Sequence, residues 1–347
     1  MQSFSTFLTL PAVIAGAIAV SLNVYAIFGG ADFGGGVWDL LASGPRRDRQ
    51  RALIADAIAP IWEANHVWLI LVVVLLFTAF PPVFARLMTL LHIPLLLLLF
   101  GIVLRGSAFT FRSYDSRRDT VQRRWGRIFA IASTITPFLL GVVVGAIAAG
   151  ALPSDAQAAL ESFSGTFVRP WLALFPLGVG ALALALFAFL AAVYLTLEAD
   201  EDALRDDFRR RALYSAVAVA AIGTLDLLLA RSGAPALWNA LTQNFAAGVL
   251  RAGAGVAALG AYLALWRRWF RVARVAAVLE VSLILWGWAV GQFPYLVPPD
   301  MTIETSAAAT TTLRLLLVAL VVGLAVLVPS LRYLFRVFKG PTLVKRL

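Results

Sequence analysis

Long apolar runs separated by short polar segments make up most of the chain. Residues 69–77 (LILVVVLLF) and 93–104 (IPLLLLLFGIVL) contain no charged side chain. The runs are continuous rather than alternating, which favours helices, and a helix that crosses a bilayer needs about 20 mostly apolar residues. The pattern predicts spanning helices over residues 8–38, 53–80, 83–110, 127–150, 171–197, 212–231, 244–266, 272–293 and 312–337.

This pattern is typical of an all-α polytopic membrane protein with about nine transmembrane helices. No connection between the apolar runs is long enough for a soluble domain, so we expect residues 1–347 to form a single integral-membrane domain. Spans one to four and five to eight each carry a basic loop after their first helix. This arrangement suggests two four-helix bundles plus one additional helix.

Composition agrees with the hydropathy pattern. Apolar residues make up 61% of the chain and charged residues 14%, against about 45–50% and 25% in soluble proteins. Cysteine is absent, which excludes disulfides and thiolate metal sites. The N-terminal segment has no basic region before its apolar run, so we interpret it as the first span and not as a signal peptide.

The basic residues indicate an orientation. The net charge is +10, and most Lys and Arg residues fall in the loops after spans one, three, five and seven and in the C-terminal tail. By the positive-inside rule the N-terminus lies outside and the C-terminus in the cytoplasm. Clustering of the charge beside the membrane argues against nucleic acid as a partner.

The start of the second span carries unexpected polar residues. The stretch PIWEANHVW places Glu63, Asn65 and His66 between Trp62 and Trp68. An ionised carboxylate deep in a bilayer costs at least about 3 kcal/mol. Glu63 is therefore expected to be paired, hydrated or protonated, and the sequence leaves two roles open: a proton relay, or a hydrogen bond or ion pair between helices.

Other carboxylates extend this pattern toward the cytoplasm. If the second span is one continuous helix, Glu63 lies about 18 Å from Arg51, and Asp56 shares its face. Asp32 and Asp39 are seven residues apart in FGGADFGGGVWDLL, where the glycines permit either close helix packing or a local break. The four acids predict a polar track that begins in the cytoplasm, with Arg105 of the third span as a counter-ion.

The chain offers few ligands for metals or haem. It has two histidines, His66 and His92, and three methionines, whereas haem in a helical bundle usually needs such residues as axial ligands. Metal-ligand spacings and Ser/His/Asp arrangements are not evident in the sequence. We expect no metal site and no catalytic residue in this chain.

An ordered set of motifs carries a resemblance to a known family. GGADFGGG (29–36), PIWEANHVWLI (60–70), FPPVFA (80–85), RGSAFTFRSY (105–114) and WGWAVGQFPYLVPP (286–299) occur in sequence along nearly the whole chain. Together they resemble subunit II of the cytochrome bd-type quinol oxidases, which are bacterial terminal oxidases of aerobic respiration.

The resemblance implies a haem-free subunit that forms a heterodimer with a subunit I carrying haem b and haem d. It leaves room for small accessory subunits and implies contact with membrane lipid and quinone. The complex oxidises quinol, reduces oxygen to water and takes its protons from the cytoplasm, which makes the reaction electrogenic. In the family pattern Trp62 and Glu63 match a tryptophan–acid pair on the proposed proton route, and Asp32 matches an aspartate of the first span.

Two departures from the family pattern affect the expected route. Many members have a further acid at the position of Gly29, and many have other residues where this chain has Ala64, Asn65 and His66. A route through this chain would start at Asp39 or Asp56 instead. His66 serves in it either as a relay or as a neutral hydrogen-bonding group.

Two other classes of function remain as alternatives. A proton-coupled secondary transporter would also combine many spans, a buried acid and a glycine-rich interruption, although transporters usually repeat such a break in two halves. A membrane anchor for a different redox enzyme is the third hypothesis. An obligate haem-bearing partner would favour either redox hypothesis over transport.

Overall fold

The computed structural model describes residues 9–58, 62–114, 119–154 and 161–339. Side chains are described for these residues except at 62–63, 112–114, 119–123, 335 and 338–339. Helices account for most of the described chain. An antiparallel pair of short strands, β1 (Tyr295–Val297) and β2 (Met301–Thr302), lies between the last two helices.

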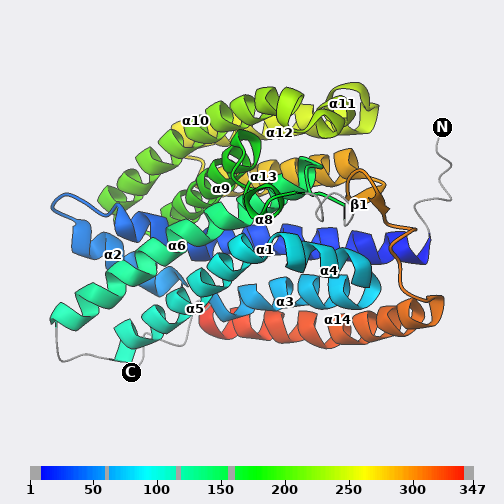
Figure 1. Cartoon of the computed structure of the whole chain (residues 1–347). Helices are drawn as coiled ribbons and strands as arrows, with labels where there is room; N and C mark the ends of the chain where they lie inside the picture. The colour runs from blue at the N-terminus through cyan, green and yellow to red at the C-terminus, as the bar shows by residue number, and fades with distance from the viewer. Residues whose placement is uncertain (1–8, 59–61, 115–118, 155–160, 340–347) are drawn as a thin grey trace.

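The long helices follow one another along the chain with short connections (Figure 1). They are α1 (Leu10–Leu40), α3 (Trp62–Ala79), α5 (His92–Tyr114), α6 (Asp119–Ala148), α9 (Leu174–Glu198), α10 (Asp202–Gly233), α12 (Phe245–Trp266), α13 (Phe270–Gln292) and α14 (Thr310–Lys339). The shorter helices are α2 (Arg47–Ile58), α4 (Pro81–Leu90), α8 (Phe163–Phe167) and α11 (Pro235–Gln243).

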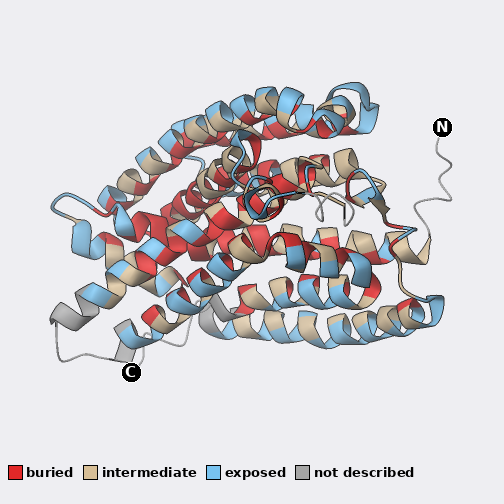
Figure 2. Ribbon diagram, in the orientation of Figure 1, coloured by how far each residue is buried: buried red, intermediate tan, exposed pale blue. Residues whose placement is uncertain are grey.

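The prediction of about nine transmembrane helices is confirmed. Within the described residues, eight helices are long and apolar enough to cross a membrane, and the bent pair α3–α4 raises the number to nine. Figure 2 shows exposed residues along the outer helices. Many large apolar side chains are among the exposed residues, as a lipid-facing surface requires. A soluble protein with this much exposed apolar surface would aggregate.

The spans form two four-helix units and one additional helix. The first unit contains α1, α3, α5 and α6, and the second contains α9, α10, α12 and α13. The units meet where α1 and α6 pack against α9, and α14 packs mainly against α3 and α1. In Figure 1, α14 lies on the side of the bundle opposite α10 and α12.

The second span differs from the helix expected over residues 53–80. Helix α2 ends at Ile58 and α3 begins at Trp62. Residues 59–61, which include Pro60, lie outside the described residues. The distance and shared face expected for Asp56 and Glu63 from one continuous helix therefore stay a prediction.

The third span also differs, because the helix expected over residues 83–110 is divided. Helix α4 turns away from α3 by 117°, and α5 begins only at His92. Two prolines open α4, and a proline ring is compatible with the first turn of a helix but not with its interior. Val83, Leu87 and Leu90 give α4 one buried face, so it packs against the bundle as an amphipathic helix.

The glycine-rich stretch of α1 forms a close helix contact and not a break. Helix α1 is continuous through residues 29–36. A side chain at Gly34 would collide with the backbone carbonyl of Phe187 on α9, and one at Gly36 would collide with Ser133 on α6. The absence of side chains at these positions lets both helices approach α1 directly.

We expect Gly34→Ala to destabilise the protein by about 1–3 kcal/mol, the usual range for overpacking a close contact. The added Cβ meets the Phe187 carbonyl and lies 2.7 Å from the Cβ of Ala191. Gly16→Ala is a matched control on the same helix, because nothing lies within 4 Å of its added Cβ. Thermal unfolding in detergent measures both, and equal melting temperatures for the two variants would contradict this packing.

Candidate functional site

A buried ion pair lies at the centre of the first unit. Arg105 of α5 donates through Nη2 to Oδ1 of Asp32 on α1, and both side chains are almost fully buried. Asn65 of α3 donates to the other carboxylate oxygen, Oδ2, over 3.4 Å. The Nε of Arg105 donates to the hydroxyl oxygen of Ser133 on α6, over 3.1 Å. These four residues, here called the Asp32 cluster, link all four helices of the unit.

Aromatic rings enclose the guanidinium group. The Cζ of Arg105 lies 4.7 Å from the ring centre of Phe33 and 5.2 Å from that of Phe129. Such cation–π contacts favour a guanidinium that has been removed from water. A buried charge pair needs both a counter-charge and hydrogen bonds to offset its desolvation, and the cluster supplies both to Arg105.

Further polar side chains belong to α1 and α3. His66, half-buried, lies beside Phe33 with ring centres 6.3 Å apart. Among the described residues, the Tyr25 hydroxyl, Asn65 Oδ1 and Trp68 Nε1 are buried and have no hydrogen-bond partner. Groups of this kind are the usual partners of internal water.

Asp39 lies seven residues after Asp32, close to the end of α1. It is buried, and its Oδ1 is 3.7 Å from the Nε of Arg51 on α2. Asp32 and Asp39 are separated by about 10 Å along the helix axis. Gly36 lies between them against Ser133, so the Ser133 hydroxyl occupies the interval between the two acids.

The remaining predicted residues divide into two groups. Asp56 is exposed on α2 and does not join the cluster. The side chains of Trp62 and Glu63 lie outside the described residues. Their backbone belongs to the first turn of α3, where Glu63 precedes Asn65 by two residues. The helix start therefore brings Glu63 near the level of Asp32 along the bundle.

Sequence reasoning missed the burial of several polar side chains, among them Ser133, Asp226 and Glu280. Ser133 is fully buried, and the only signal for it is a short polar run, STIT, within an apolar helix. Asp226 and Glu280, which their positions along the chain place near the membrane surfaces, are 5% and 4% exposed. Gly178 of α9 leaves the space that the Asp226 carboxylate occupies.

The two histidines have different surroundings. His66 lies beside the Asp32 cluster, whereas His92 begins α5 and its Nδ1 is 2.8 Å from the carbonyl oxygen of Thr89. In the described part of the chain, no three His, Cys, Asp or Glu side chains are grouped so as to hold a metal ion.

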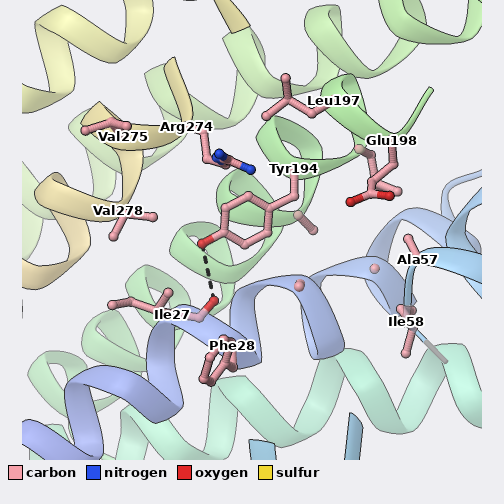
Figure 3. A pocket seen from close by; sticks show the side chains of 14 residues that line it. Ile27, Phe28, Ala57, Ile58, Tyr194, Leu197, Glu198, Arg274, Val275 and Val278 are labelled. Carbon is pink, nitrogen blue, oxygen red and sulfur yellow. Dashed lines mark hydrogen bonds between the residues drawn. The ribbon is translucent and has the colours of Figure 1, made fainter. Parts of the chain in front are cut away.

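A mostly apolar cavity of about 380 Å³ lies between α1, α2, α9 and α13 (Figure 3). The Tyr194 hydroxyl donates to the carbonyl oxygen of Ile27 over 3.4 Å. Figure 3 shows Glu198 and Arg274 on either side of Tyr194. Gly35, in the glycine-rich stretch three residues after Asp32, forms part of the wall.

Comparisons with known proteins agree with one another. A protein-family model described as cytochrome bd terminal oxidase subunit II matches residues 10–338. The putative cytochrome bd menaquinol oxidase subunit II of Bacillus subtilis (strain 168) is 23% identical over 323 residues, covering 91% of each chain. Cytochrome bd-I ubiquinol oxidase subunit 2 of Escherichia coli (strain K12) is 32% identical over 134 residues, covering 38% of this chain and 34% of that protein.

The fold also matches a solved structure. A chain in the structure of bd oxidase from Geobacillus thermodenitrificans aligns with a TM-score of 0.74 and 21% sequence identity. The alignment covers 95% of this chain and 99% of that chain.

A double-mutant cycle tests the ion pair. We expect Asp32→Asn and Arg105→Gln each to cost about 3–5 kcal/mol, because each leaves one buried charge without its partner. The double variant should lose clearly less than the sum of the two. The exposed pair Arg49–Glu201, 2.8 Å apart, is the control, since such pairs contribute at most about 1 kcal/mol. Thermal unfolding in detergent measures both cycles, and an equally small coupling in both would contradict the assignment.

Proposed function

The chain belongs to the cytochrome bd terminal oxidase subunit II family, and from this membership we propose that it is the haem-free subunit of a quinol-oxidising terminal oxidase and carries part of its proton route. The family model covers residues 10–338, nearly the whole chain. The chain is therefore a membrane-spanning subunit of an oxidoreductase complex. The buried Asp32 cluster is the observation that carries the proton role.

The overall reaction sets the demand for protons. Reduction of one oxygen molecule to two waters consumes four electrons and four protons, and oxidation of two quinols supplies four electrons and releases four protons. Haems b and d in a partner subunit I would supply the oxygen chemistry. Protons taken up from the opposite side of the membrane would make the reaction electrogenic, and they require polar carriers through the hydrocarbon.

The polar residues of the first unit suit such carriers. Proton transfer between side chains needs hydrogen-bond contact of about 2.6–3.2 Å, directly or through water. The interval of about 10 Å between Asp39 and Asp32 therefore needs intermediate groups. The Ser133 hydroxyl lies in that interval, and water can bridge the remainder.

Helix α3 supplies the next groups on the proposed route. Asn65 holds Asp32 by a hydrogen bond, and Glu63 and His66 flank Asn65 on the same helix. Arg105 provides a fixed positive charge beside Asp32, which attracts the carboxylate and limits the free passage of other cations. Trp62 completes the tryptophan–acid pair of the family. Asp56, exposed on α2, would serve only as an entry group that water can replace.

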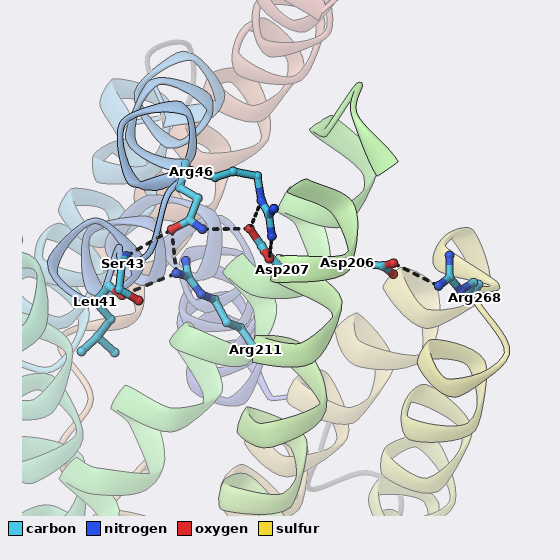
Figure 4. Close-up of polar contacts among 8 residues, drawn as sticks. Leu41, Ser43, Arg46, Asp206, Asp207, Arg211 and Arg268 are labelled. Carbon is cyan, nitrogen blue, oxygen red and sulfur yellow. Dashed lines mark hydrogen bonds and ion pairs between the residues drawn. The ribbon is translucent and has the colours of Figure 1, made fainter. Parts of the chain in front are cut away.

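The arrangement of basic residues supports the proposed orientation. Arg46 pairs with Asp207 at the start of α10, and Arg268, after α12, pairs with Asp206 (Figure 4). The loops after α1 and α12 thus meet the start of α10 on one face. A cytoplasmic position for this basic face agrees with the positive-inside rule and places the Asp39 end of the route in the cytoplasm.

The first experiment asks which proteins accompany the chain. We expect it to purify from its native membrane with a larger helical subunit, and the reduced-minus-oxidised spectrum to show b-type and d-type haem bands. Small accessory subunits would appear in the same preparation. Purification of the chain alone, without haem, would contradict the oxidase function and favour transport.

The second experiment tests the proton role separately. In the assembled complex, we expect Glu63→Gln to lower quinol-dependent oxygen consumption at least about tenfold, a modest loss for a group that carries protons. Glu63→Asp should retain most of the activity, because it keeps a carboxyl group. Asp200→Asn is the control, since Asp200 is exposed outside the spanning helices. Normal turnover of Glu63→Gln at every pH, with normal haem content, would contradict the proton role and leave the oxidase function intact.

A further inference from the structure

A second polar site lies at the end of the bundle where α1 ends and α2 and α10 begin. Gly44, with φ of +77°, makes the tight turn after α1, since such a backbone favours glycine. The turn places Arg46 beside α10 (Figure 4). A cavity of about 260 Å³ there is lined by three arginines and one aspartate: Arg46, Arg210, Arg211 and Asp207. We call it the arginine pocket.

Asp207 is already engaged within the pocket. Arg46 donates to both of its carboxylate oxygens, through Nε over 2.8 Å and Nη2 over 2.6 Å. Gln50 donates to Oδ2 over 2.9 Å. The hydrogen bond from Arg46 to Asp207 raises the pKa of the guanidinium, so Arg46 stays charged. Three guanidinium groups and one carboxylate leave an excess of two positive charges.

Among the described residues, the other two arginines have no salt bridge of their own. Arg211 donates through Nη2 to Gln50 Oε1 over 2.7 Å, and its guanidinium lies over the rings of Trp38 and Phe208. Its Nη1 is shielded from solvent and has no hydrogen-bond partner among the described residues. In the same described part of the chain, no salt bridge includes Arg210 or Arg211, and Arg210 is exposed.

Apolar surface continues from the pocket along α10. Tyr214 and Val217, four and seven residues after Arg210 on the same helix face, are 75% and 57% exposed. Leu40 and Leu41, at the end of α1, are also exposed. A small soluble anion would make no contact with this apolar surface, whereas the acyl chains of a lipid would cover it.

We infer that the arginine pocket binds the phosphate headgroup of an anionic phospholipid, with the acyl chains lying along α10. Guanidinium groups bind phosphate through paired, charge-assisted hydrogen bonds. Basic pockets between transmembrane helices on a membrane face are suited to anionic headgroups. The bound lipid bridges the turn after α1, in the first unit, and α10, in the second, and its site is separate from the Asp32 cluster.

The test uses native mass spectrometry of the intact, delipidated oxidase complex titrated with phosphatidylglycerol. We expect Arg210→Gln to bind it about fivefold more weakly than the unchanged complex, and Arg210→Lys to retain most of the affinity. Arg271→Gln is the matched control. Arg271 is also exposed, is the second residue of α13, and lies outside the pocket. Phosphatidylcholine and inorganic phosphate are tested in parallel as alternative ligands.

Each result decides the assignment. Selective loss of phosphatidylglycerol binding in Arg210→Gln, with Arg271→Gln unchanged, supports the lipid site. Equal losses in both variants would mean a general effect of surface charge and would overturn it. Thermal stabilisation by inorganic phosphate that depends on Arg210, without preference for phosphatidylglycerol over phosphatidylcholine, would identify a site for a soluble anion and would also overturn it.

Discussion

The buried ion pair between Asp32 and Arg105 constrains the first unit more strongly than any other single contact described. Hydrocarbon offers no alternative partner for either charge, so each must meet the other. Asn65 and Ser133 add hydrogen bonds from the two remaining helices. Rotation or sliding of any one helix would separate a charged or polar group from its partner. The pair therefore fixes the register of four helices, whatever part it also plays in moving protons.

The glycines of α1 and the ion pair depend on each other. Gly34 lets the backbone of α9 close over one side of α1, and Gly36 admits Ser133 on another. Trp38 donates to the carbonyl oxygen of Ala188 over 2.7 Å and extends the α1–α9 contact toward the helix end. This close packing keeps lipid away from the charges. Without the charges, the same small side chains would give a smooth and weakly specific interface.

Hydropathy was sufficient to predict the spans, because the bilayer sets their length and composition. It did not predict α4, where the apolar segment continues past a change of direction. The two prolines after Phe80 mark that position, but a count of apolar residues does not register them. Polar positions within the apolar spans identified Asp32 and Glu63 as residues of interest, with Arg105 as a counter-ion. The pairing of Arg105 with Asp32 needed the structure, because it depends on which faces of α1 and α5 meet.

Burial of the polar residues was the least predictable property. Asp56 and Asp39 are both acids near a helix end, yet Asp56 is exposed and Asp39 is buried beside Arg51. Ser133, Asp226 and Glu280 are buried because of their neighbours and not because of their position along the helix. A single sequence gives depth in the membrane approximately and gives the neighbouring helix hardly at all.

The position of α14 has a consequence for biosynthesis. This helix follows the second unit in the chain but returns to α3 and α1 of the first, and only 6% of its most apolar stretch is buried. The first unit ends at Ala148 and α14 begins at Thr310, so the first unit is synthesised well before α14 can reach it. Until then the faces of α1 and α3 that receive α14 are covered by lipid alone. Final assembly of the first unit is thus post-insertional, and it depends on lateral docking of a late helix within the bilayer.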